Sequence, residues 1–297
     1  MRNFIGVDLG GTNIRAAIVS EDGTIKCMKK SESHPERGAE AVMETMISLI
    51  ESLDGYEECE GIGMGIPGPI DTINGKIIVS TNLPKLIGFP IAEYIENHFH
   101  KPTYMDNDVK VAALGEAVQG AGKDYPIVYY VTISTGVGGA LVIDQKVIGG
   151  QNGGEIGNIC IDRNREKYNI LNVGAVENEA SGTAVTRKGK AVFGDKINHA
   201  GDVFDLARSG DEQALKIVDD MAYDLAMMFC AIGHIIDPHV FVVGGGVMKG
   251  KDVFFEKMES YYRSMIHVGM QPVVFKEALL DEPGIIGAAM LPMTHLK

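Results

Sequence analysis

Cysteine is scarce in this sequence, and its placement argues against a disulfide framework. The four cysteines stand far apart, and no pair has the CxxC or CxC spacing of a local metal knuckle. Thiols scattered in this way are typical of reduced residues in a protein core. We therefore expect neither disulfides nor a zinc site among Cys27, Cys59, Cys160 and Cys230.

Positive charge is also in short supply. The chain has 27 lysines and arginines against 40 aspartates and glutamates, which gives a formal net charge of −13. Binding to the phosphate backbone of a nucleic acid needs a basic face, so we expect no nucleic-acid partner. A small anionic ligand is still compatible with this charge, because backbone amides and one cation suffice to hold it.

Long apolar runs are missing as well. No apolar stretch approaches the ~18 residues that cross a bilayer, and the N-terminus has neither a basic leader region nor a cleavage site. No low-complexity segment or block of like charge suggests a disordered tail. These absences predict a cytoplasmic protein that does not bind membranes and whose whole chain folds.

The length and the hydrophobic pattern predict two α/β halves. A chain of 297 residues suits about two domains of ~150 residues. The first half begins with a three-stranded antiparallel meander at 3–9, 13–20 and 24–30, followed by a helix at 37–53, a strand at 61–66, a helix near 90–98, a strand near 103–106 and a helix at 108–119. The second half repeats this order with strands at 127–134, 138–143 and 145–148, helices near 178–192, 201–208 and 211–236, a strand at 240–243, a helix at 251–264, a strand near 271–276 and a helix at 284–292.

Each half carries a glycine-rich turn after its first strand, at residues 8–15 and 132–139. Glycines let the backbone approach a ligand and present N–H groups to phosphate oxygens, and an aspartate at a strand end is suited to hydrated Mg²⁺. A tight hairpin explains either turn alone, but two at matching places predict that they bind one triphosphate. The candidate ligands are Asp8, Gly10, Gly11, Thr12, Arg15, Thr135, Gly136 and Gly138, with Asp8 holding Mg²⁺ indirectly.

Another glycine run, Gly244-Gly245-Gly246, ends a buried strand before a helix. Bare backbone at the carboxyl end of a strand lets a flat adenine and ribose lie against it. A tight turn explains this run equally well.

The dipeptide Asn107-Asp108 stands where a strand passes into a helix. Aspartate is among the best N-cap residues, so Asp108 is expected to cap that helix or to act as a base. Phosphoryl transfer to a hydroxyl needs a carboxylate within hydrogen-bond reach of it, held ionised by the positive end of a helix. Taken alone, the two interpretations have equal weight.

Three polar residues in the second half are candidate sugar ligands. Glu155 and Asn158 lie in a glycine-rich segment, and Glu177 follows nineteen residues after Asn158. Carboxylates and amides that bind adjacent hydroxyls are how a pocket holds a polyol. Acidic residues on the surface are the alternative for each glutamate.

With these motifs in order, the chain resembles the ROK family of sugar kinases and related repressors over nearly its full length, from Asp8 to Gly287. The motifs that carry the resemblance are residues 8–15, 65–71, 82–84, 107–108, 135–138, 154–157 and 177–182, and Asp237-Pro238 leading to the glycines at 244–246.

The resemblance implies an α/β fold of the actin-like ATPase (ribonuclease H-like) class, with two lobes around a cleft. The small lobe is expected at residues 1–111, completed by a C-terminal helix at 284–297, and the large lobe at 112–283. ATP with Mg²⁺, a homodimer, Asp108 as general base and a hexose or N-acylhexosamine phosphorylated at the 6-hydroxyl are also implied. The implied sugar contacts are Gly68, Asn82, Asn107, Asp108, Glu155, Asn158 and Glu177.

The chain departs from the family pattern at a structural zinc site. Relatives commonly have a histidine at the position of Asn158 and a CxCGxxGC cluster, where this chain has Tyr168, Ile170 and Ala175. With no cysteine or histidine among residues 161–198, we expect no zinc here and a loop held by packing of Tyr168, Ile170 and Leu171. A smaller departure is Lys110, which we interpret as a solvated helix residue.

Two other functions compete with a sugar kinase. Repressors of the family carry a DNA-binding domain before the first glycine motif, which here begins at residue 8, so a DNA reader is not expected. A non-catalytic sugar-binding or sensing protein of the same fold is the stronger alternative, and the retained Asp108 favours the kinase. Which sugar is used stays open among glucose, allose, fructose, mannose and N-acetylmannosamine.

Overall fold

The computed structural model describes residues 1–151, 153–270 and 272–295, and the chain divides into two compact units. The first unit comprises residues 1–128, 140–154 and 278–297, and the second comprises 129–139 and 155–277. The sequence placed the start of the large lobe at residue 112, whereas the segment from 112 to 128 belongs to the first unit. The last two residues of the expected C-terminal helix, Leu296 and Lys297, lie outside the described residues.

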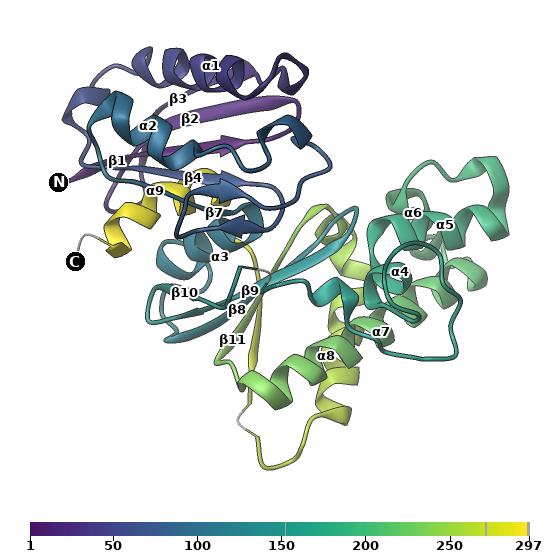
Figure 1. Ribbon diagram of the computed structural model, residues 1–297. Helices are drawn as coiled ribbons and strands as arrows, with labels where there is room; N and C mark the ends of the chain where they lie inside the picture. Colours follow the sequence, from purple (N-terminus) through teal and green to yellow (C-terminus); the bar gives the residue numbers. More distant parts are fainter. Residues whose placement is uncertain (152, 271, 296–297) are drawn as a thin grey trace. The chain divides into compact units, whose positions relative to one another are not determined.

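The first unit is built on a five-stranded sheet with the order β3-β2-β1-β4-β7 (Figure 1). The strands β1 (Asn3–Leu9), β2 (Asn13–Ser20) and β3 (Ile25–Glu32) pair antiparallel and confirm the expected meander. The strands β4 (Ile62–Ile66) and β7 (Thr103–Asn107) continue the sheet in parallel with β1. A small hairpin of β5 (Ile70–Asp71) and β6 (Lys76–Ile77) was not expected.

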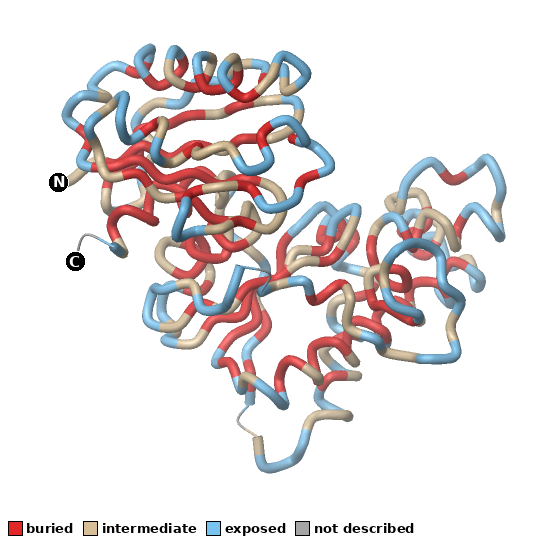
Figure 2. The backbone as a smooth tube through the Cα atoms, in the orientation of Figure 1, coloured by how far each residue is buried: buried red, intermediate tan, exposed pale blue. Residues whose placement is uncertain are grey.

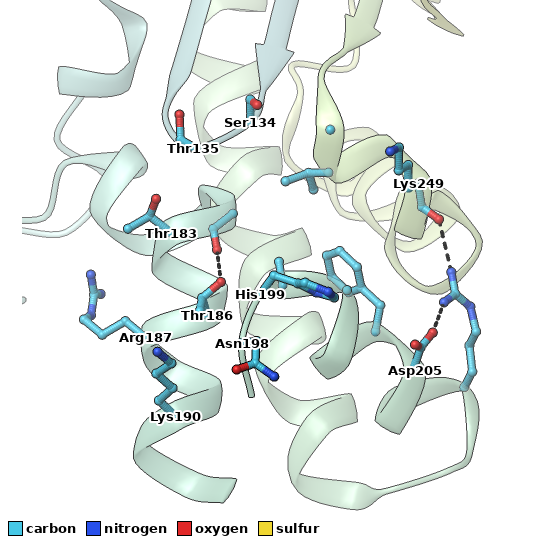
Figure 3. A pocket seen from close by; sticks show the side chains of 17 residues that line it. Ser134, Thr135, Thr183, Thr186, Arg187, Lys190, Asn198, His199, Asp205 and Lys249 are labelled. Carbon is cyan, nitrogen blue, oxygen red and sulfur yellow. Dashed lines mark hydrogen bonds and ion pairs between the residues drawn. The ribbon is translucent and has the colours of Figure 1, made fainter. Parts of the chain in front are cut away.

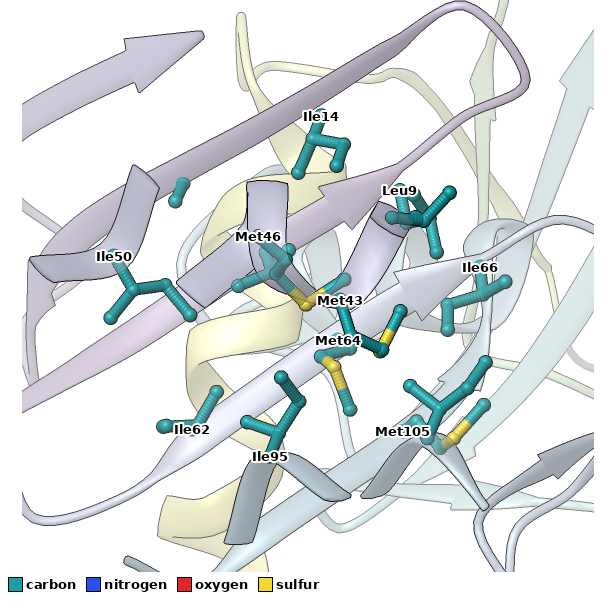
Figure 4. Close-up of a cluster of buried hydrophobic side chains, with 14 of the residues drawn as sticks. Leu9, Ile14, Met43, Met46, Ile50, Ile62, Met64, Ile66, Ile95 and Met105 are labelled. Atoms are coloured by element: carbon teal, nitrogen blue, oxygen red, sulfur yellow. The ribbon is translucent and has the colours of Figure 1, made fainter. Parts of the chain in front are cut away.

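Among the described residues, the α-helices of this unit are α1 (Ala39–Glu51), α2 (Ile91–Phe99), α3 (Asp108–Val118) and α9 (Pro283–His295). Figure 4 shows the apolar core in which Met43 and Met46 of α1 and Ile95 of α2 pack with Leu9 and Met64 of the sheet. Methionine suits this core because its unbranched side chain fills irregular gaps.

Glycines let α9 pack directly on the backbone of β1, β4 and α3. A Cβ atom at Gly63 would lie 1.8 Å from the carbonyl oxygen of Ala288, and one at Gly287 would lie 1.6 Å from the carbonyl oxygen of Val111. At these distances a Cβ atom would overlap the carbonyl oxygen, so only glycine fits at either position. Helix α3, which begins at Asp108, is therefore fixed by the last helix of the chain.

The second five-stranded sheet has the order β10-β9-β8-β11-β12. Its strands are β8 (Ile127–Ile133), β9 (Val137–Ile143), β10 (Lys146–Ile148), β11 (Val240–Gly244) and β12 (Val274–Glu277). The strands β8 and β9 contribute residues to both units. Among the described residues, the strand expected near 271–276 runs from Val274 to Glu277, and Gln271 lies outside the described residues.

The helices of the second unit are α4 (Val176–Ala180), α5 (Gly182–Phe193), α6 (Ala200–Arg208), α7 (Glu212–Ile236) and α8 (Lys251–Met265). The single helix expected at 178–192 is wrong, because Ser181 is extended and its side chain accepts a hydrogen bond from the N–H of Ala184, which caps α5. Short 3-10 turns lie at Pro35–Arg37, Tyr56–Glu58, Pro84–Leu86, Ile156–Asn158, Gly194–Lys196 and Gly246–Gly250.

Burial follows these elements (Figure 2): the central strands and the inward faces of the helices are buried, and the loops are exposed. In the second unit Phe229, Phe241 and Phe275 pack edge to face or stacked, with ring centroids 4.9–5.1 Å apart. Along the described chain, no helix is both long and apolar enough to cross a membrane.

Candidate active site in the two units

Asp108 is the first residue of α3, and its neighbour Asn107 is the N-cap. The Asn107 side chain accepts hydrogen bonds from the N–H groups of Val109 and Lys110, at 2.9 and 3.4 Å, and donates from Nδ2 to the carbonyl oxygen of Gly68 at 3.1 Å. The capping role considered for Asp108 therefore falls to Asn107. Asp108 keeps one further bond to the helix, from the Val109 N–H to Oδ1 at 2.9 Å.

The environment of Asp108 makes its carboxylate a stronger base than an ordinary aspartate. Burial raises its pKa, and the negative charge of Asp8 adds to this effect, while the hydrogen bonds from Val109 and Asn107 counteract it. A base is most effective when its pKa moves toward the working pH. The position thus combines partial burial with a neighbouring like charge.

Gly68 has a backbone φ of +103°, a conformation that residues with a side chain rarely adopt. A Cβ atom there would also lie 2.3 Å from the carbonyl oxygen of Val79. With its own carbonyl bonded to Asn107, this glycine joins the segment after β4 to the start of α3.

The first glycine-rich turn lies between β1 and β2. The N–H of Gly10 donates to the carbonyl oxygen of Asn13 at 2.8 Å, and a Cβ atom at Gly11 would lie 3.0 Å from that of the exposed Asn82. Thr12 is exposed and its carbonyl oxygen accepts a hydrogen bond from the N–H of Ser33. Asn82 and the turn are thus neighbours.

Asp8 and Arg15 form an ion pair at the base of this turn. Arg15 Nε donates to Oδ2 of Asp8 at 3.1 Å, and the Arg15 guanidinium also pairs with Glu282 ahead of α9. Arg15, a candidate nucleotide ligand, is therefore bound to two carboxylates of its own unit. Its charge offsets part of the negative charge that Asp8, Asp108 and Glu282 bring to the unit.

The second turn joins β8 to β9 and is held by close backbone contacts. The N–H of Gly182 donates to the carbonyl oxygen of Ser134 at 2.7 Å, and a Cβ atom at Gly245 would lie 2.3 Å from the carbonyl oxygen of Ile133. Gly245 has a φ of +94°. The turn, the start of α5 and the glycines after β11 are thereby gathered at one place.

Glu177 of α4 reaches the same turn. Its Oε2 accepts a hydrogen bond from the N–H of Val137 at 2.9 Å, and Cβ atoms at Gly136 and Gly157 would lie 2.5 and 2.9 Å from that oxygen. The carboxylate therefore sits between two glycine backbones. Glu155, two residues before Gly157, is exposed at the N-cap of a 3-10 turn.

A cavity of about 870 Å³ opens beside this turn in the second unit (Figure 3). It is large enough for a nucleotide-sized ligand. Among the predicted nucleotide ligands, Thr135 and Gly246 line it, whereas Gly138 lies inside β9 and Gly244 is the last residue of β11. The lining residues are Ser134, Thr135, Gly182, Thr183, Thr186, Arg187, Lys190, Asn198, His199, Ala200, Gly201, Phe204, Asp205, Arg208, Gly246, Val247 and Lys249.

Most of this lining was not predicted, although one part has a clear sequence signal. Thr183, Thr186, Arg187 and Lys190 are spaced at i, i+3, i+4 and i+7, which places them on one face of α5 (Figure 3). A polar stripe that begins directly after the Ser181-Gly182 helix start is consistent with a ligand-facing surface. The contributions of α6 and of Lys249 have no comparable signal.

The interpretation of Lys110 as a solvated residue is wrong. Its side chain is buried in the first unit, with Nζ 3.5 Å from Oδ1 of Asp106 and donating to the carbonyl oxygen of Gly150 at 2.8 Å. Burial raises the pKa of Asp106, and the Lys110 ammonium counteracts this. A buried lysine needs such partners, because an unpaired buried charge is strongly destabilising.

The packing expected for the loop that replaces the zinc motif is wrong for Ile170 and Tyr168, whereas Leu171 is half-buried. Ile170 is 96% exposed and Tyr168 is 48% exposed, so neither side chain is buried in a core. Instead, the Arg187 guanidinium stacks on the Tyr168 ring, with its central carbon 3.7 Å from the ring centroid.

Asn158, a predicted sugar ligand, is bonded to Asn172 through two hydrogen bonds, both at 3.1 Å. Its side-chain Oδ1 accepts from the backbone N–H of Asn172, and its backbone carbonyl oxygen accepts from the side-chain amide of Asn172.

Comparison with known proteins places the chain in a family. The sequence model of the ROK family matches residues 4–294. The chain belongs to the ROK family. Among curated relatives, this ROK protein is 31% identical to the glucokinase of Thermotoga maritima over 97% of this chain and 96% of that protein. It is 27% identical to the N-acetyl-D-glucosamine kinase of Pectobacterium carotovorum subsp. carotovorum over 97% and 98%.

Solved ROK structures have the same fold. The ROK hexokinase from Thermus thermophilus superposes with a TM-score of 0.88 at 29% identity and covers 99% of both chains. The ROK glucokinase from Streptomyces griseus, solved in complex with glucose and AMPPNP, gives a TM-score of 0.76 at 26% identity over 97% of this chain and 98% of that one. The expected α/β fold of the actin-like ATPase class is thereby confirmed.

Proposed function

We propose that this ROK protein is a sugar kinase that transfers the γ-phosphoryl group of ATP to the 6-hydroxyl of a hexose or N-acylhexosamine, with Asp108 as general base. The observation that carries the proposal is the state of Asp108. It begins α3 without being the cap, it is half-buried, and burial together with Asp8 raises its pKa. A carboxylate whose only role was to cap the helix would need neither this burial nor a raised pKa.

Asp108 accepts the proton of the sugar hydroxyl as that oxygen attacks phosphorus. The positive end of the α3 dipole and the Val109 N–H stabilise the ionised carboxylate, so that it is ready to accept the proton. Asn107 fixes the helix start, and Gly68 fixes Asn107. In this account Gly68 and Asn107 orient the base as well as contacting the sugar, and Asn82 beside Gly11 is a further sugar contact.

The nucleotide is bound by the second unit. The hydroxyls of Ser134 and Thr135 and the backbone of the turn receive the phosphates, and Arg187, Lys190 and Lys249 supply positive charge around the cavity. Support for ATP comes from the AMPPNP complex of the Streptomyces griseus relative. The backbone at Gly246 and the side chain of Phe204 are suited to contact a flat base.

The donor set also fits Mg²⁺ held through water. Arg15 binds Oδ2 of Asp8, so that Oδ1 is the oxygen that would receive a water of the hydrated ion. When bound, the ion neutralises charge on the β- and γ-phosphates. Gly10, Gly11 and Thr12 present the backbone of the first turn beside Asp8.

The sugar is held by carboxylates of the second unit in addition to Asp108. Glu177 is fixed by the Val137 N–H, and Glu155 is exposed and available for hydroxyls. Asn158 contributes indirectly, because its side chain holds Asn172. A non-catalytic sugar-binding protein would share these contacts, and Asp108 separates the two functions.

The test is an ADP-release assay with the purified protein and Mg-ATP across a panel of hexoses and N-acylhexosamines. We expect turnover with at least one sugar, and ³¹P–¹H correlation spectra of the product should place the phosphate on the 6-hydroxyl. Calorimetric binding of a sugar without ADP release from any panel member would favour the non-catalytic alternative.

A further inference from the structure

The loop at residues 159–175 connects the 3-10 turn at Ile156–Asn158 to helix α4, which carries Glu177. Its two ends are joined to each other. The N–H of Ile161 donates to the carbonyl oxygen of Gly174 at 2.9 Å, and Cys160 and Ala175 form an isolated antiparallel bridge. With Ile170 almost fully exposed, apolar packing does not explain what holds the middle of this loop in place.

Tyr168 stacks on Arg187, and the Asn169 and Asn178 side chains exchange two hydrogen bonds at 3.0 and 3.1 Å. The charged contacts of the loop form an ion network with Arg165 at its centre. The three guanidinium nitrogens of Arg165 bind Oδ2 of Asp162 at 3.2 Å, Oε2 of Glu179 at 2.8 Å and Oδ1 of Asp224 at 3.0 Å. Asp162 lies in the loop, Glu179 on α4 and Asp224 on α7. A single loop residue is thereby bonded to two helices.

The network is built around buried charge. The side chains of Glu179 and Asp224 are 4% and 1% exposed, and Lys188 of α5 provides a second cation, 3.0 Å from Oε2 of Glu179. Burial raises the pKa of Asp224, while Arg165 and Lys188 counteract this. Without Arg165, Lys188 alone would face two buried carboxylates, a situation that strongly destabilises folded proteins.

The network leads directly to the candidate sugar ligands. Glu179 lies two residues after Glu177 on the short helix α4, so fixing one positions the other. At the opposite end of the loop, Asn158 is bonded to Asn172 and follows Gly157, which contacts the Glu177 carboxylate. Arg165 therefore binds the helix that carries Glu177, and the loop that contains Arg165 is bonded through Asn172 to the backbone next to Glu177.

We propose that Arg165 is a positioning residue for sugar binding: by joining loop 159–175 to Glu179 and Asp224 it fixes Glu177 in the orientation that holds the sugar. This rests on the proposed function of Glu177 as a sugar ligand. We call the ion network of Arg165 with Asp162, Glu179 and Asp224 the Arg165 clamp. It consists only of protein side chains and holds the loop in which the family resemblance would put a zinc ion. It thus orders loop 159–175 without a metal.

The test compares Arg165→Met with the wild type and with Arg263→Met. Arg263 is an exposed arginine of α8 that pairs with Glu259, so this control removes the same charge away from the loop. Steady-state rates are measured with the panel sugar that the wild type phosphorylates fastest. For Arg165→Met we expect the KM for sugar to rise at least tenfold, with kcat and the KM for ATP changing less than threefold. Arg165→Lys should fall between, since an ammonium cannot bind three carboxylates in the same fork.

Hydrogen exchange provides a readout that does not depend on turnover. Amides in 159–175 should exchange at least tenfold faster in Arg165→Met than in the wild type, and those of α8 should not change. If Arg165→Met does not fold, the triple variant Arg165→Met/Glu179→Gln/Asp224→Asn removes the two buried carboxylates that Arg165 neutralises, while the Lys188 ammonium that it leaves is 22% exposed. This variant should show the same raised KM and fast exchange.

Two results would overturn the clamp. One is a folded Arg165→Met, or triple variant, whose loop exchanges at the wild-type rate; the other is a sugar KM within twofold of wild type. Failure of the proposed function has a different signature, because the wild type would then release no ADP with any sugar while the exchange comparison would still decide whether Arg165 holds the loop.

Discussion

Replacing Asp108 by asparagine should separate catalysis from stability. Asparagine has the same shape, and its side-chain oxygen can still accept the hydrogen bond from the Val109 N–H that Asp108 accepts at 2.9 Å. It cannot take a proton from a sugar hydroxyl. Loss of a positioned base typically lowers the rate by about 10²–10⁴, which corresponds to roughly 3–5 kcal/mol of activation free energy.

The folded state of the same variant should be at least as stable as that of the wild type, although its turnover is lost. Burial raises the pKa of Asp108 in the folded state, so its contribution to stability is complete below the unfolded pKa of about 3.9 and is lost as the pH rises through the raised folded pKa. At neutral pH the ionised carboxylate is therefore a source of instability, which Asp108→Asn removes. We expect a Tm equal to or above that of the wild type together with the loss of turnover.

Three measurements decide this prediction. The kcat of Asp108→Asn is compared with that of Asp124→Asn, a control at an exposed aspartate of the same unit, and Tm is recorded for both. In the wild type, kcat/KM should decrease as the pH is lowered, and the pH at its midpoint should lie above the pKa of an ordinary aspartate. More than a tenth of wild-type kcat in Asp108→Asn, or a large drop in its Tm, would refute this account of the residue.

Further predictions concern the packing of the first unit and the lack of a zinc-binding cysteine cluster in the loop at residues 159–175. Lys110→Met should lower the free energy of unfolding by about 3–5 kcal/mol because it leaves Asp106 buried without its cation, and chemical denaturation should show that Lys110→Met/Asp106→Asn recovers part of this loss. Gly287→Ala should have a much lower Tm than Gly284→Ala on the same helix. The added Cβ would lie 1.6 Å from the carbonyl oxygen of Val111 in the first variant and would meet no atom within 4 Å in the second. Similar Tm values would contradict the close packing of α9 on α3. After exhaustive chelation and resupply of Mg²⁺ alone, activity should return in full, and metal analysis that finds one tightly held zinc per chain would count against this.

The sequence predicted most of the regular elements because their signals are local. Alternation gave the meander, apolar periodicity gave the helices, and glycine-rich turns marked the hairpin between β1 and β2 and that between β8 and β9. The asparagine and aspartate at 107–108 were recognised as a helix start, but which one is the cap depends on the contact with Gly68, which is 39 residues away in the chain.

What the sequence did not show are contacts between distant charges. Lys110 stands among apolar residues of α3, yet its burial depends on Asp106 one turn earlier and on the carbonyl oxygen of Gly150. Arg165 binds carboxylates 14 and 59 residues further along. Periodicity carries no information on such pairs, and a loop rich in polar residues offers no other pattern from which to infer them.

The dependence of β1 and β4 on α9 has a consequence for how the chain is made. The backbone of Gly6 and Gly63 is covered by helix backbone from Ile285 and Ala288, so this face of the first sheet stays bare until nearly the whole chain exists. At a synthesis rate of about 5–20 residues per second, the interval between the end of the first segment at 128 and the arrival of α9 is roughly 8–30 s. During that time the second unit is synthesised while the first lacks its last helix. A nascent chain of this protein should therefore expose an apolar sheet to chaperones late in translation, and a stop codon before α9 should yield an insoluble product even though every residue of the proposed site is present.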